Sequence, residues 1–347
     1  MSNAAGNDRV ALWDNYKFIL IYLVVLGHLA NKTADSVIGA RAVFLFIYLF
    51  HMPAFAFVSG LFAKNTVKNK RYDKVFEYLT LYLGFSVLMC LFYMVIQHKQ
   101  NFRLLYQDST PWYALALFNW FLITICLQRL KGSYWLIASI VLGIMVGYDK
   151  EVHDVLALSR TLVLYPFFLT GYLLDRKKLE KLAENKVLKI LSIFALAVAA
   201  GLVYWKNGVF YHYRGLYTAR NGYALIKAIG NSMYGGVYRM VYYVVAAGLS
   251  FLLLLATPTR RYFFTSWGTR SMTTYVFHMI PLYLFTRANT INGKSIAEYM
   301  IVNSKTPWIF VIAAVIVFVC GMPVFEKILN FFVKPRWKSP ETETKEK

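Results

Sequence analysis

The chain has 347 residues, of which 58% are hydrophobic and 16% are charged, and its mean hydropathy is +0.46. A soluble globular domain is about 45–50% apolar with roughly a quarter of its residues charged, so the composition excludes that class and predicts a polytopic membrane protein. The formal net charge is +21, but the basic residues fall in short loops between apolar segments. Anionic lipids and the positive-inside bias explain that distribution better than a nucleic-acid partner does.

Ten apolar segments follow one another along the chain and have roughly the length of membrane spans, about 17–25 residues. They lie at about 16–31, 42–63, 75–96, 111–129, 133–148, 156–174, 187–205, 235–256, 271–287 and 307–332. We therefore predict an all-α polytopic membrane protein of about ten transmembrane helices. The membrane domain is expected to cover residues 1–333, and residues 334–347 are expected to form a disordered polar tail.

The first span carries a basic residue near one end and a histidine well inside it. Lys17 and His28 are eleven residues apart. On a helix this is about three turns plus 20°, so the two side chains are predicted to share one face, about 16 Å apart along the axis. If the helix crosses a bilayer, Lys17 lies at the water interface and His28 lies near mid-depth.

Two further histidines fall inside predicted spans, His51 in the second and His278 in the ninth. Ionisable groups inside a bilayer are costly and usually functional, and a histidine can move protons near neutral pH. We therefore take His28, His51 and His278 as catalytic candidates. A metal site is the alternative for three histidines. No metal is predicted, because no carboxylate lies near them in the sequence and no two are spaced i, i+4. The other histidines fall in outer loops, at His98, His153 and His212.

Arginines mark the outer ends of several spans, at Arg41, Arg160 and Arg239. Snorkelling to the interface would explain them, but the positive-inside bias disfavours arginine on this side. At least one of them is therefore expected to have a partner or ligand. The second span ends in Ser59 and Gly60, whose small size predicts close helix packing.

Lysine and arginine are concentrated in alternate loops, which predicts the orientation of the chain. The segments 64–74, 175–189 and 260–270 carry five, six and three of them. All fall on one side of the membrane if there are ten spans, so both termini are predicted to be cytoplasmic. The longest outer loop, 206–234, is rich in Tyr, Gly and Asn. It is expected either to face carbohydrate or to be an ordinary structured loop.

Five motifs occur in order between about residues 10 and 290. The first is Lys17, ten residues and His28, preceded by Asp14 and Asn15 in "WDNYK". The others are "FHMPAFAFVSGLF", "PWYALALFNWFL", "SRTLVLYPFFLTGYLL" and "GTRSMTTYVFHMIPLY". Together they resemble the membrane acyltransferase-3 family, in its branch of fucose 4-O-acetylase-like proteins. Many relatives also carry an extracytoplasmic esterase-like domain. The sequence shows no such domain, so the acceptor is expected to be met at the membrane domain or through a separate partner protein.

The resemblance implies a multi-pass O-acetyltransferase of the plasma membrane. Its acyl donor would be cytoplasmic acetyl-CoA, with no tightly bound cofactor. Its acceptor would be a hydroxyl of an extracytoplasmic glycan, such as a capsule, an exopolysaccharide or a lipid-linked sugar. His28 is expected to act either as general base or as a transient acyl carrier. The sequence leaves that choice open, together with the identity of the sugar and of the acyl group.

The resemblance and the predicted topology divide the remaining candidates between two sides of the membrane. The donor is expected to meet the basic residues near the cytoplasmic ends of the spans, namely Lys17, Arg260 and Arg261. Asp14 is expected either to position Lys17 or to cap its helix. The acceptor or the developing oxyanion is expected to meet Arg160, Arg239, Trp112 and Tyr113.

Two other classes of function stay open. A transporter or flippase of a glycan or lipid-linked sugar would also need broken helices and buried charge, but no inverted repeat is visible and the intramembrane charge is histidine-rich. A structural partner of a polysaccharide assembly complex is disfavoured by the set of motifs. Membrane lipids are expected partners, and the sequence does not decide whether the protein forms a homo-oligomer.

Overall fold

The computed structural model describes residues 10–97, 110–149, 151–152, 155–288, 290–291 and 293–333. The α-helices of these residues are α1 (Ala11–Thr33), α2 (Ile38–Tyr48), α3 (His51–Leu61), α4 (Lys64–Lys68), α5 (Tyr72–Gln97), α6 (Trp112–Leu127), α7 (Gly132–Met145), α8 (Leu158–Leu173), α9 (Arg176–Ala183), α10 (Lys186–Trp205), α11 (Asn207–His212), α12 (Arg214–Tyr217), α13 (Gly235–Ala256), α14 (Thr265–Gly268), α15 (Ser271–Phe277), α16 (Met279–Tyr283), α17 (Ile296–Val302), α18 (Ile309–Cys320) and α19 (Pro323–Val333). Strands β1 (Thr290–Ile291) and β2 (Lys294–Ser295) form one antiparallel pair, in which Thr290 faces Ser295. The predicted tail, His98 and His153 lie outside the described residues.

The predicted apolar segments all coincide with helices, some of them broken. Within the described residues, four helical stretches are long and apolar enough to cross a membrane by themselves: Ile38–Leu61, Tyr72–Val95, Lys186–Trp205 and Ser232–Ala256. A fifth follows if the pair Thr306–Cys320 and Pro323–Phe331, bent by 56°, counts as one span. The fold is therefore that of an all-α, multi-pass integral membrane protein, whereas the number of ten spans and the side of the termini stay predictions.

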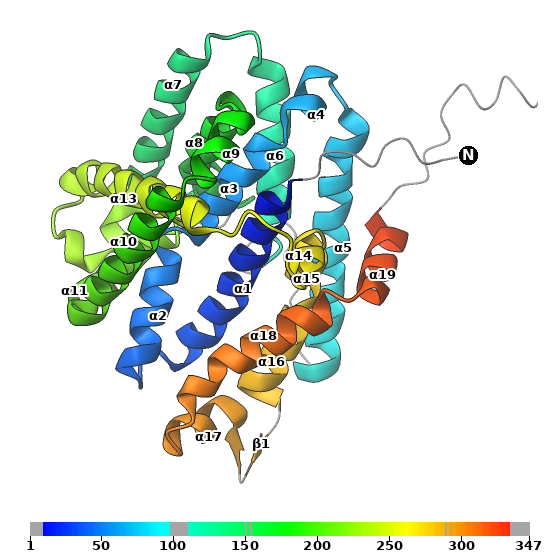
Figure 1. Cartoon of the computed structure of the whole chain (residues 1–347). Helices are drawn as coiled ribbons and strands as arrows, with labels where there is room; N and C mark the ends of the chain where they lie inside the picture. Colours follow the sequence, from blue (N-terminus) through cyan, green and yellow to red (C-terminus); the bar gives the residue numbers. More distant parts are fainter. Residues whose placement is uncertain are drawn as a thin grey trace, which may run out of the picture.

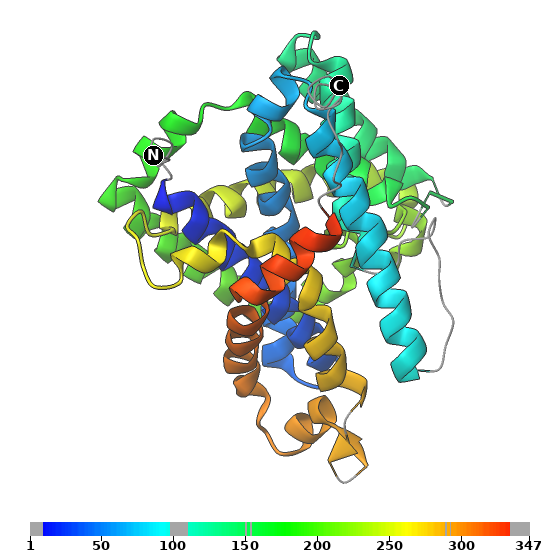
Figure 2. The same cartoon turned by 90° about the vertical axis from the view of Figure 1, so that its right-hand side faces the viewer.

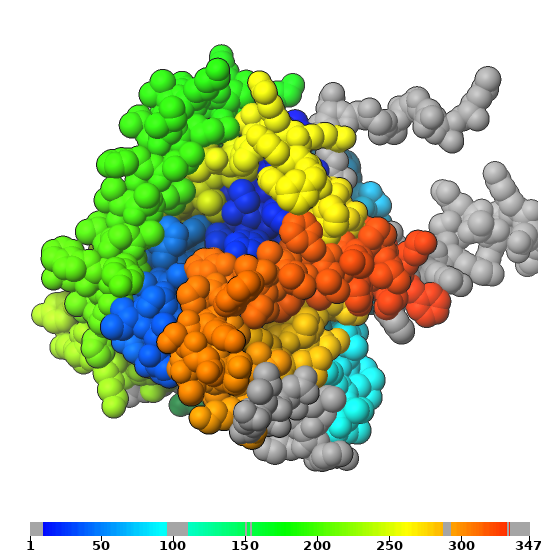
Figure 3. Space-filling model, turned by 60° about the horizontal axis from the view of Figure 1, so that its bottom comes forward, coloured from blue at the N-terminus to red at the C-terminus, as the bar shows by residue number. Residues whose placement is uncertain are grey.

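The helix α1 runs through the middle of the molecule (Figure 1). It packs against α2 and α3 and against α14, α15 and α18. Its core-facing side chains are almost fully buried, for example Tyr16, Leu20, Val25 and Leu29. The space-filling view shows atoms of α1 framed by the green, yellow and orange segments that follow later in the chain (Figure 3). The candidate residues of the first span are thus held in the interior of the bundle.

The second predicted span is broken in a way that positions a histidine. The helices α2 and α3 are separated at Leu49 and Phe50, just before Pro53. Proline has no backbone N–H, so it cannot bond the carbonyl of Leu49 four residues earlier. The break places His51 at the first residue of α3.

The helices α3 and α8 touch backbone to backbone. A Cβ atom on Gly60 would lie 1.8 Å from the carbonyl oxygen of Phe168, and one on Gly171 would lie 2.0 Å from the carbonyl oxygen of Phe57. Any side chain at either position would force the helices apart. The close packing predicted at Gly60 is confirmed, and it fixes α8 as the support of α3.

The helix α5 stands at one edge of the bundle, where Figure 2 shows it as a long straight helix. It packs on α6 and, near its start, on α19. The hydroxyl of Thr80 on α5 donates to the carbonyl of Val333 at the end of α19, at 2.9 Å. The helix thereby closes one side of the space around α1.

Candidate functional site

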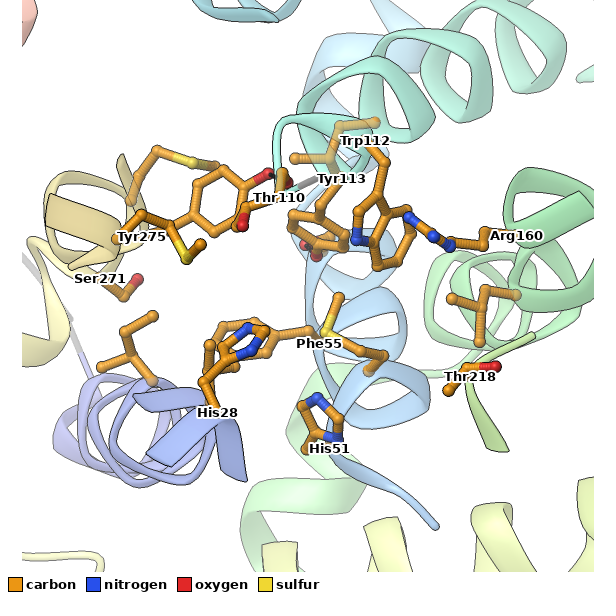
Figure 4. A pocket seen from close by; sticks show the side chains of 18 of the residues that line it. His28, His51, Phe55, Thr110, Trp112, Tyr113, Arg160, Thr218, Ser271 and Tyr275 are labelled. Atoms are coloured by element: carbon orange, nitrogen blue, oxygen red, sulfur yellow. Dashed lines mark hydrogen bonds between the residues drawn. The ribbon is translucent and has the colours of Figure 1, made fainter. Parts of the chain in front are cut away.

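A cavity of about 860 Å³ lies along α1 and is lined by side chains from many helices, some of which Figure 4 shows. Along α1 its wall follows a single face, made of Lys17, Ile21, Val24, His28, Asn31 and Lys32. The prediction that Lys17 and His28 share one face is therefore confirmed. From Lys17 to Lys32 the helix rises by about 22 Å, so the wall follows most of the length of α1.

The three candidate histidines come together beside this cavity, although they belong to distant parts of the chain. The ring centroids of His28 and His278 are 5.6 Å apart. The ring of Tyr48 contacts both His28 and His51, with its centroid 6.4 Å from that of His28 and 4.8 Å from that of His51. His28 and His51 line the cavity, whereas His278 is fully buried and does not.

The hydrogen bonds of these histidines determine which ring nitrogen can act. Nδ1 of His51 lies 2.9 Å from the carbonyl oxygen of Ile47. A carbonyl oxygen can only accept, so Nδ1 donates, and the lone pair of the neutral ring is on Nε2. Nδ1 of His28 is 3.5 Å from the hydroxyl of Tyr48, at the limit of a hydrogen bond. Among the described residues, no three His, Cys, Asp or Glu side chains are grouped as metal ligands.

One end of the cavity is basic and is built around the start of α1. Lys17 pairs with Asp14 at 2.9 Å, and its ammonium group lies over the ring of Phe62 at 5.6 Å. The guanidinium of Arg176 contacts the same ring at 5.7 Å. Lys74 at the start of α5 also lines this end. In the segment 64–74 only Thr66 and Lys74 line the cavity.

Asn15 fixes the start of α1 to the loop that follows α13. Its amide nitrogen donates to the carbonyls of Pro258 and Arg260, at 2.9 and 2.8 Å, and its oxygen accepts from the hydroxyl of Thr265 at 2.6 Å. The side chains of Arg260 and Arg261 are exposed and do not line the cavity. The structure therefore brings Lys17 and Asp14 together, whereas neither arginine side chain lines the cavity as predicted for the donor site.

The aromatic residues predicted for the acceptor lie at the cavity wall with Arg160. The guanidinium of Arg160 is 5.0 Å from the ring centroid of Trp112. The hydroxyl of Tyr113 bonds that of Ser59 at 2.9 Å. All four residues line the cavity. Figure 4 shows Trp112 and Tyr113 across the cavity from His28, with Arg160 to one side.

Arg239 has a different position from the one predicted. It is fully buried and does not line the cavity. Its Nη1 donates to the carbonyl of Leu216 at 2.8 Å, and the rings of Tyr223 and Tyr242 flank its guanidinium at 5.7 and 5.6 Å. It supports the wall from behind, because Tyr217, Thr218 and Arg220, which follow Leu216, do line the cavity.

Several lining residues were not identified by sequence reasoning. Tyr48 and Tyr275 are aromatic residues in apolar segments, where nothing in the hydropathy pattern separates a cavity residue from a core residue. Lys32 ends the face of α1 that starts at Lys17, so extending the same helical spacing beyond His28 would have found it. Lys74 belongs to the basic segment 64–74 but has no feature that distinguishes it from its neighbours there.

Comparisons with known proteins identify the family of the chain. The acyltransferase-3 family profile, described as "Acyltransferase domain", matches residues 11–326. The chain is 25% identical over 219 residues to the nodulation protein NolL of Sinorhizobium fredii (strain NBRC 101917 / NGR234). That match covers 56% of the chain and 57% of NolL, so the chain spans little more than half the length of this relative. No solved structure matches the chain. Because the family profile covers nearly all of the chain, the protein belongs to the acyltransferase-3 family of membrane acyltransferases.

Proposed function

We propose that the protein transfers an acetyl group from cytoplasmic acetyl-CoA to a hydroxyl of a glycan on the other side of the membrane. The observation that carries this proposal is the single cavity whose wall runs along α1 from Lys17, past His28, to Lys32. A donor made on one side and an acceptor presented on the other must meet at a shared centre. On that wall His28 is the histidine, His51 of α3 also lines the cavity, and His278 lies behind His28.

The proposal includes the predicted topology of about ten spans with both termini cytoplasmic. In this proposal, the end of the cavity lined by Lys17 and Lys74 faces the donor side of the membrane, and the opposite end, lined by Lys32, faces the acceptor side. Single cysteines at exposed Lys68 and His212, tested with an impermeant maleimide in intact cells, should react only at position 212. Labelling of both positions would contradict the orientation.

The donor end suits coenzyme A. Lys17 and Lys74 line this end and can bond phosphate oxygens as charged donors. The rise from Lys17 to His28 is about 16 Å, a distance that a pantetheine arm can span. The thioester would thereby be delivered to the histidines while the nucleotide stays at the mouth.

The acceptor end suits a hydroxyl-rich ligand. Trp112, Tyr113 and Tyr217 offer flat apolar faces on which sugar rings can stack, and Thr218 offers a hydroxyl. Arg160 is placed to bond an acceptor oxygen or the oxyanion that develops on the thioester carbonyl. We assign Arg239 a supporting role, because it holds Leu216 and does not reach the cavity.

The reaction is an acyl transfer centred on His28. The imidazole removes the proton of the acceptor hydroxyl while that oxygen attacks the thioester carbonyl, and the tetrahedral intermediate collapses with loss of the CoA thiolate. The proton on His28 then passes to the thiolate. In the covalent variant, a neutral ring nitrogen of His28 attacks the thioester carbonyl and expels the CoA thiolate, which takes up the N–H proton of the ring. The acceptor hydroxyl then attacks the acyl-imidazole, the bond to His28 breaks, and the hydroxyl proton passes to the released ring. Both routes need His28 at the cavity surface, where it lies.

The direct test uses purified protein in lipid nanodiscs and acetyl-CoA labelled in the acetyl group. The wild type is expected to hydrolyse acetyl-CoA slowly or to acetylate itself. His28→Ala should lower this turnover by about 10²–10⁴-fold, whereas His212→Ala, at an exposed histidine on α11, should not change it. Turnover above a tenth of wild type in His28→Ala would exclude His28 as the base.

A cellular experiment separates the proposal from its rival. The surface glycan of deletion cells is analysed for ester-linked acetyl groups after complementation with the wild type or with His28→Ala. Loss of acetylation with normal amounts of glycan supports the acetyltransferase. Loss of glycan export, with an inert purified protein, would favour the transporter or flippase.

A further inference from the structure

One ring nitrogen of His278 is hydrogen-bonded to the backbone, and the other has no hydrogen bond within the described residues. His278 follows the last residue of α15, and its Nδ1 lies 2.8 Å from the carbonyl oxygen of Tyr275 and 3.1 Å from that of Thr274. Both oxygens can only accept, so Nδ1 carries the proton. In the neutral ring, Nε2 therefore holds a lone pair and can only accept.

This acceptor is buried without a partner. Nε2 of His278 has no hydrogen-bond partner among the described residues, and the side chain is 0% exposed. Buried polar atoms are nearly always bonded, so an exception requires an explanation. A substrate cannot supply the bond, because His278 does not line the cavity.

The ring of His28 lies against His278. The centroids are 5.6 Å apart with a tilt of 33° between the planes, which is within the range of contacting aromatic rings. Catalytic hydrogen bonds are often long before substrate binds and tighten in the complex. His28 is partly exposed to the cavity, so its ring has the cavity on one side and His278 on the other.

We propose that His278 is the positioning residue of His28. Nε2 of His278 accepts a hydrogen bond from the N–H of the His28 ring, namely from the ring nitrogen that points away from the acceptor hydroxyl. The inference rests on the proposed role of His28 as base. A neutral imidazole has one N–H and one lone pair. A partner that holds the N–H fixes the tautomer and turns the lone pair to the cavity. The same bond becomes stronger when His28 takes the proton, because the donor is then charged.

Other groups also face His28, and they have different roles. Tyr48 approaches its Nδ1, and His51 and Lys32 act on it electrostatically. These three residues line the cavity, so each can meet a substrate. His278 is confined to the back of His28, which is the geometry of a group that acts through another.

The test measures the protonation of His28 without relying on acetyl transfer. Purified protein in nanodiscs is treated with diethyl pyrocarbonate over a range of pH, and modification of His28 is quantified by mass spectrometry. The reagent attacks only unprotonated imidazole. His278→Asn keeps a donor near the position of Nδ1 but has nothing at Nε2, whereas His278→Gln can place its amide oxygen near Nε2.

We expect the pH at which His28 is half-reactive to move lower in His278→Asn and to return toward wild type in His278→Gln. The sign follows because removing the acceptor disfavours the protonated ring, which then stays reactive at lower pH. Val276→Ala, at a buried apolar position of the same helix, serves as the packing control. The exposed His212 controls for the reagent. Val276→Ala should not change the pH profile of His28, and the pH profile of His212 should be the same in all variants.

Kinetics give the second readout. His278→Asn should lower kcat for acetyl-CoA hydrolysis by about 10-fold or more with KM unchanged, since the interaction is made in the transition state. An unmoved half-reactive pH in His278→Asn overturns the inference, and so does a change that Val276→Ala reproduces. If the wild type shows no turnover, the proposed function fails, while the reagent profile still decides the contact between the histidines.

Discussion

The ammonium group of Lys17 lies 2.9 Å from the carboxylate of Asp14, one helical turn earlier on α1. Asp14 is the fourth residue of the helix, and the residue at the cap is Val10, which offers no side-chain hydrogen bond. Of the two roles that the sequence left open for Asp14, the structure therefore favours the positioning of Lys17 over helix capping. The pair directs a long, flexible side chain to the mouth of the cavity.

Replacing Lys17 should weaken donor binding more than it slows the chemistry. A hydrogen bond to a charged group is worth about 1.5–3 kcal/mol, so Lys17→Ala should raise KM for acetyl-CoA by about 10- to 100-fold. Lys17→Arg keeps the charge and the pair with Asp14 and should stay within a few-fold of wild type. Donor titrations of hydrolysis measure both. An unchanged KM in Lys17→Ala would remove Lys17 from the donor site.

Lys74 and Lys64 provide a matched comparison within one basic segment. Lys74 lines the cavity, whereas Nζ of Lys64 donates to the carbonyl of Leu174 at 2.6 Å and lies outside it. We expect Lys74→Gln to raise KM for acetyl-CoA by about 10-fold, as for one charged hydrogen bond, and Lys64→Gln to leave it unchanged.

The remaining basic residues of this segment and of the loop after α13 do not line the cavity and should behave like Lys64: Lys68, Lys70, Arg71, Arg260 and Arg261. Equal effects of Lys64→Gln and Lys74→Gln would mean that the segment acts only through its net charge.

Gly60→Ala should destabilise the protein, because its methyl group would collide with a backbone carbonyl of α8. Overpacking typically costs about 1–3 kcal/mol and more where backbone must move. Thermal unfolding in detergent measures the loss. The control is Gly84→Ala on α5, where a Cβ atom meets nothing within 4 Å, so its stability should be unchanged or slightly raised. Equal melting temperatures for Gly60→Ala and wild type would refute the contact.

Arg160→Ala should separate the two half-reactions. If Arg160, which lies beside Trp112, binds the acceptor and not the oxyanion, acetyl-CoA hydrolysis should survive within a few-fold, while glycan acetylation should fall by about 10-fold or more. Hydrolysis in nanodiscs and acetylation in complemented cells are the two measurements. Parallel loss of both in a folded protein would place Arg160 in the shared centre.

Arg239→Ala should act through the wall that it supports. We expect glycan acetylation to fall while hydrolysis is retained, together with a lower melting temperature, because the carbonyl of Leu216 loses its buried donor. Arg239→Lys, which can still donate one hydrogen bond, should recover part of the glycan acetylation and part of the melting temperature. If hydrolysis also disappears in a folded Arg239→Ala protein, the assignment of Arg239 to the acceptor side is wrong.

The sequence was sufficient to find a site residue where that residue is polar inside an apolar span, or where helical spacing puts it on the same face as another candidate. His28, His51 and His278 could be found because charge inside an apolar span is rare. Lys17 could be paired with His28 because eleven residues return to the same helix face. The close approach at Gly60 followed from its small size.

Other parts of the site depend on packing between distant segments and could not be predicted. Arg239 has the sequence appearance of a ligand-binding arginine, but whether it points into a cavity or toward Leu216 depends on how α12 folds against α13. His278 lies behind His28 because α15 packs on α1, across a separation of 250 residues. Asn15 binds the backbone carbonyls of Pro258 and Arg260, but the side chains of Arg260 and Arg261 do not line the cavity.

The glycine contact between α3 and α8 determines which parts of the site can move relative to each other. Because the backbones are in direct contact at Gly60 and Gly171, we expect α3 and α8 to move together as one body, which carries His51, Ser59 and Arg160. A second body is formed by α1 and α14, because a Cβ atom on Gly268 would lie 1.8 Å from the carbonyl oxygen of Asp14. His28 belongs to this second body. Tyr48 packs on this second body, because a Cβ atom on Gly27 of α1 would lie 3.2 Å from its ring. The contact between the rings of Tyr48 and His51, 4.8 Å apart, therefore spans the seam between the two bodies. An opening that admits substrate is expected to alter this distance first, and it offers a position for a conformational reporter.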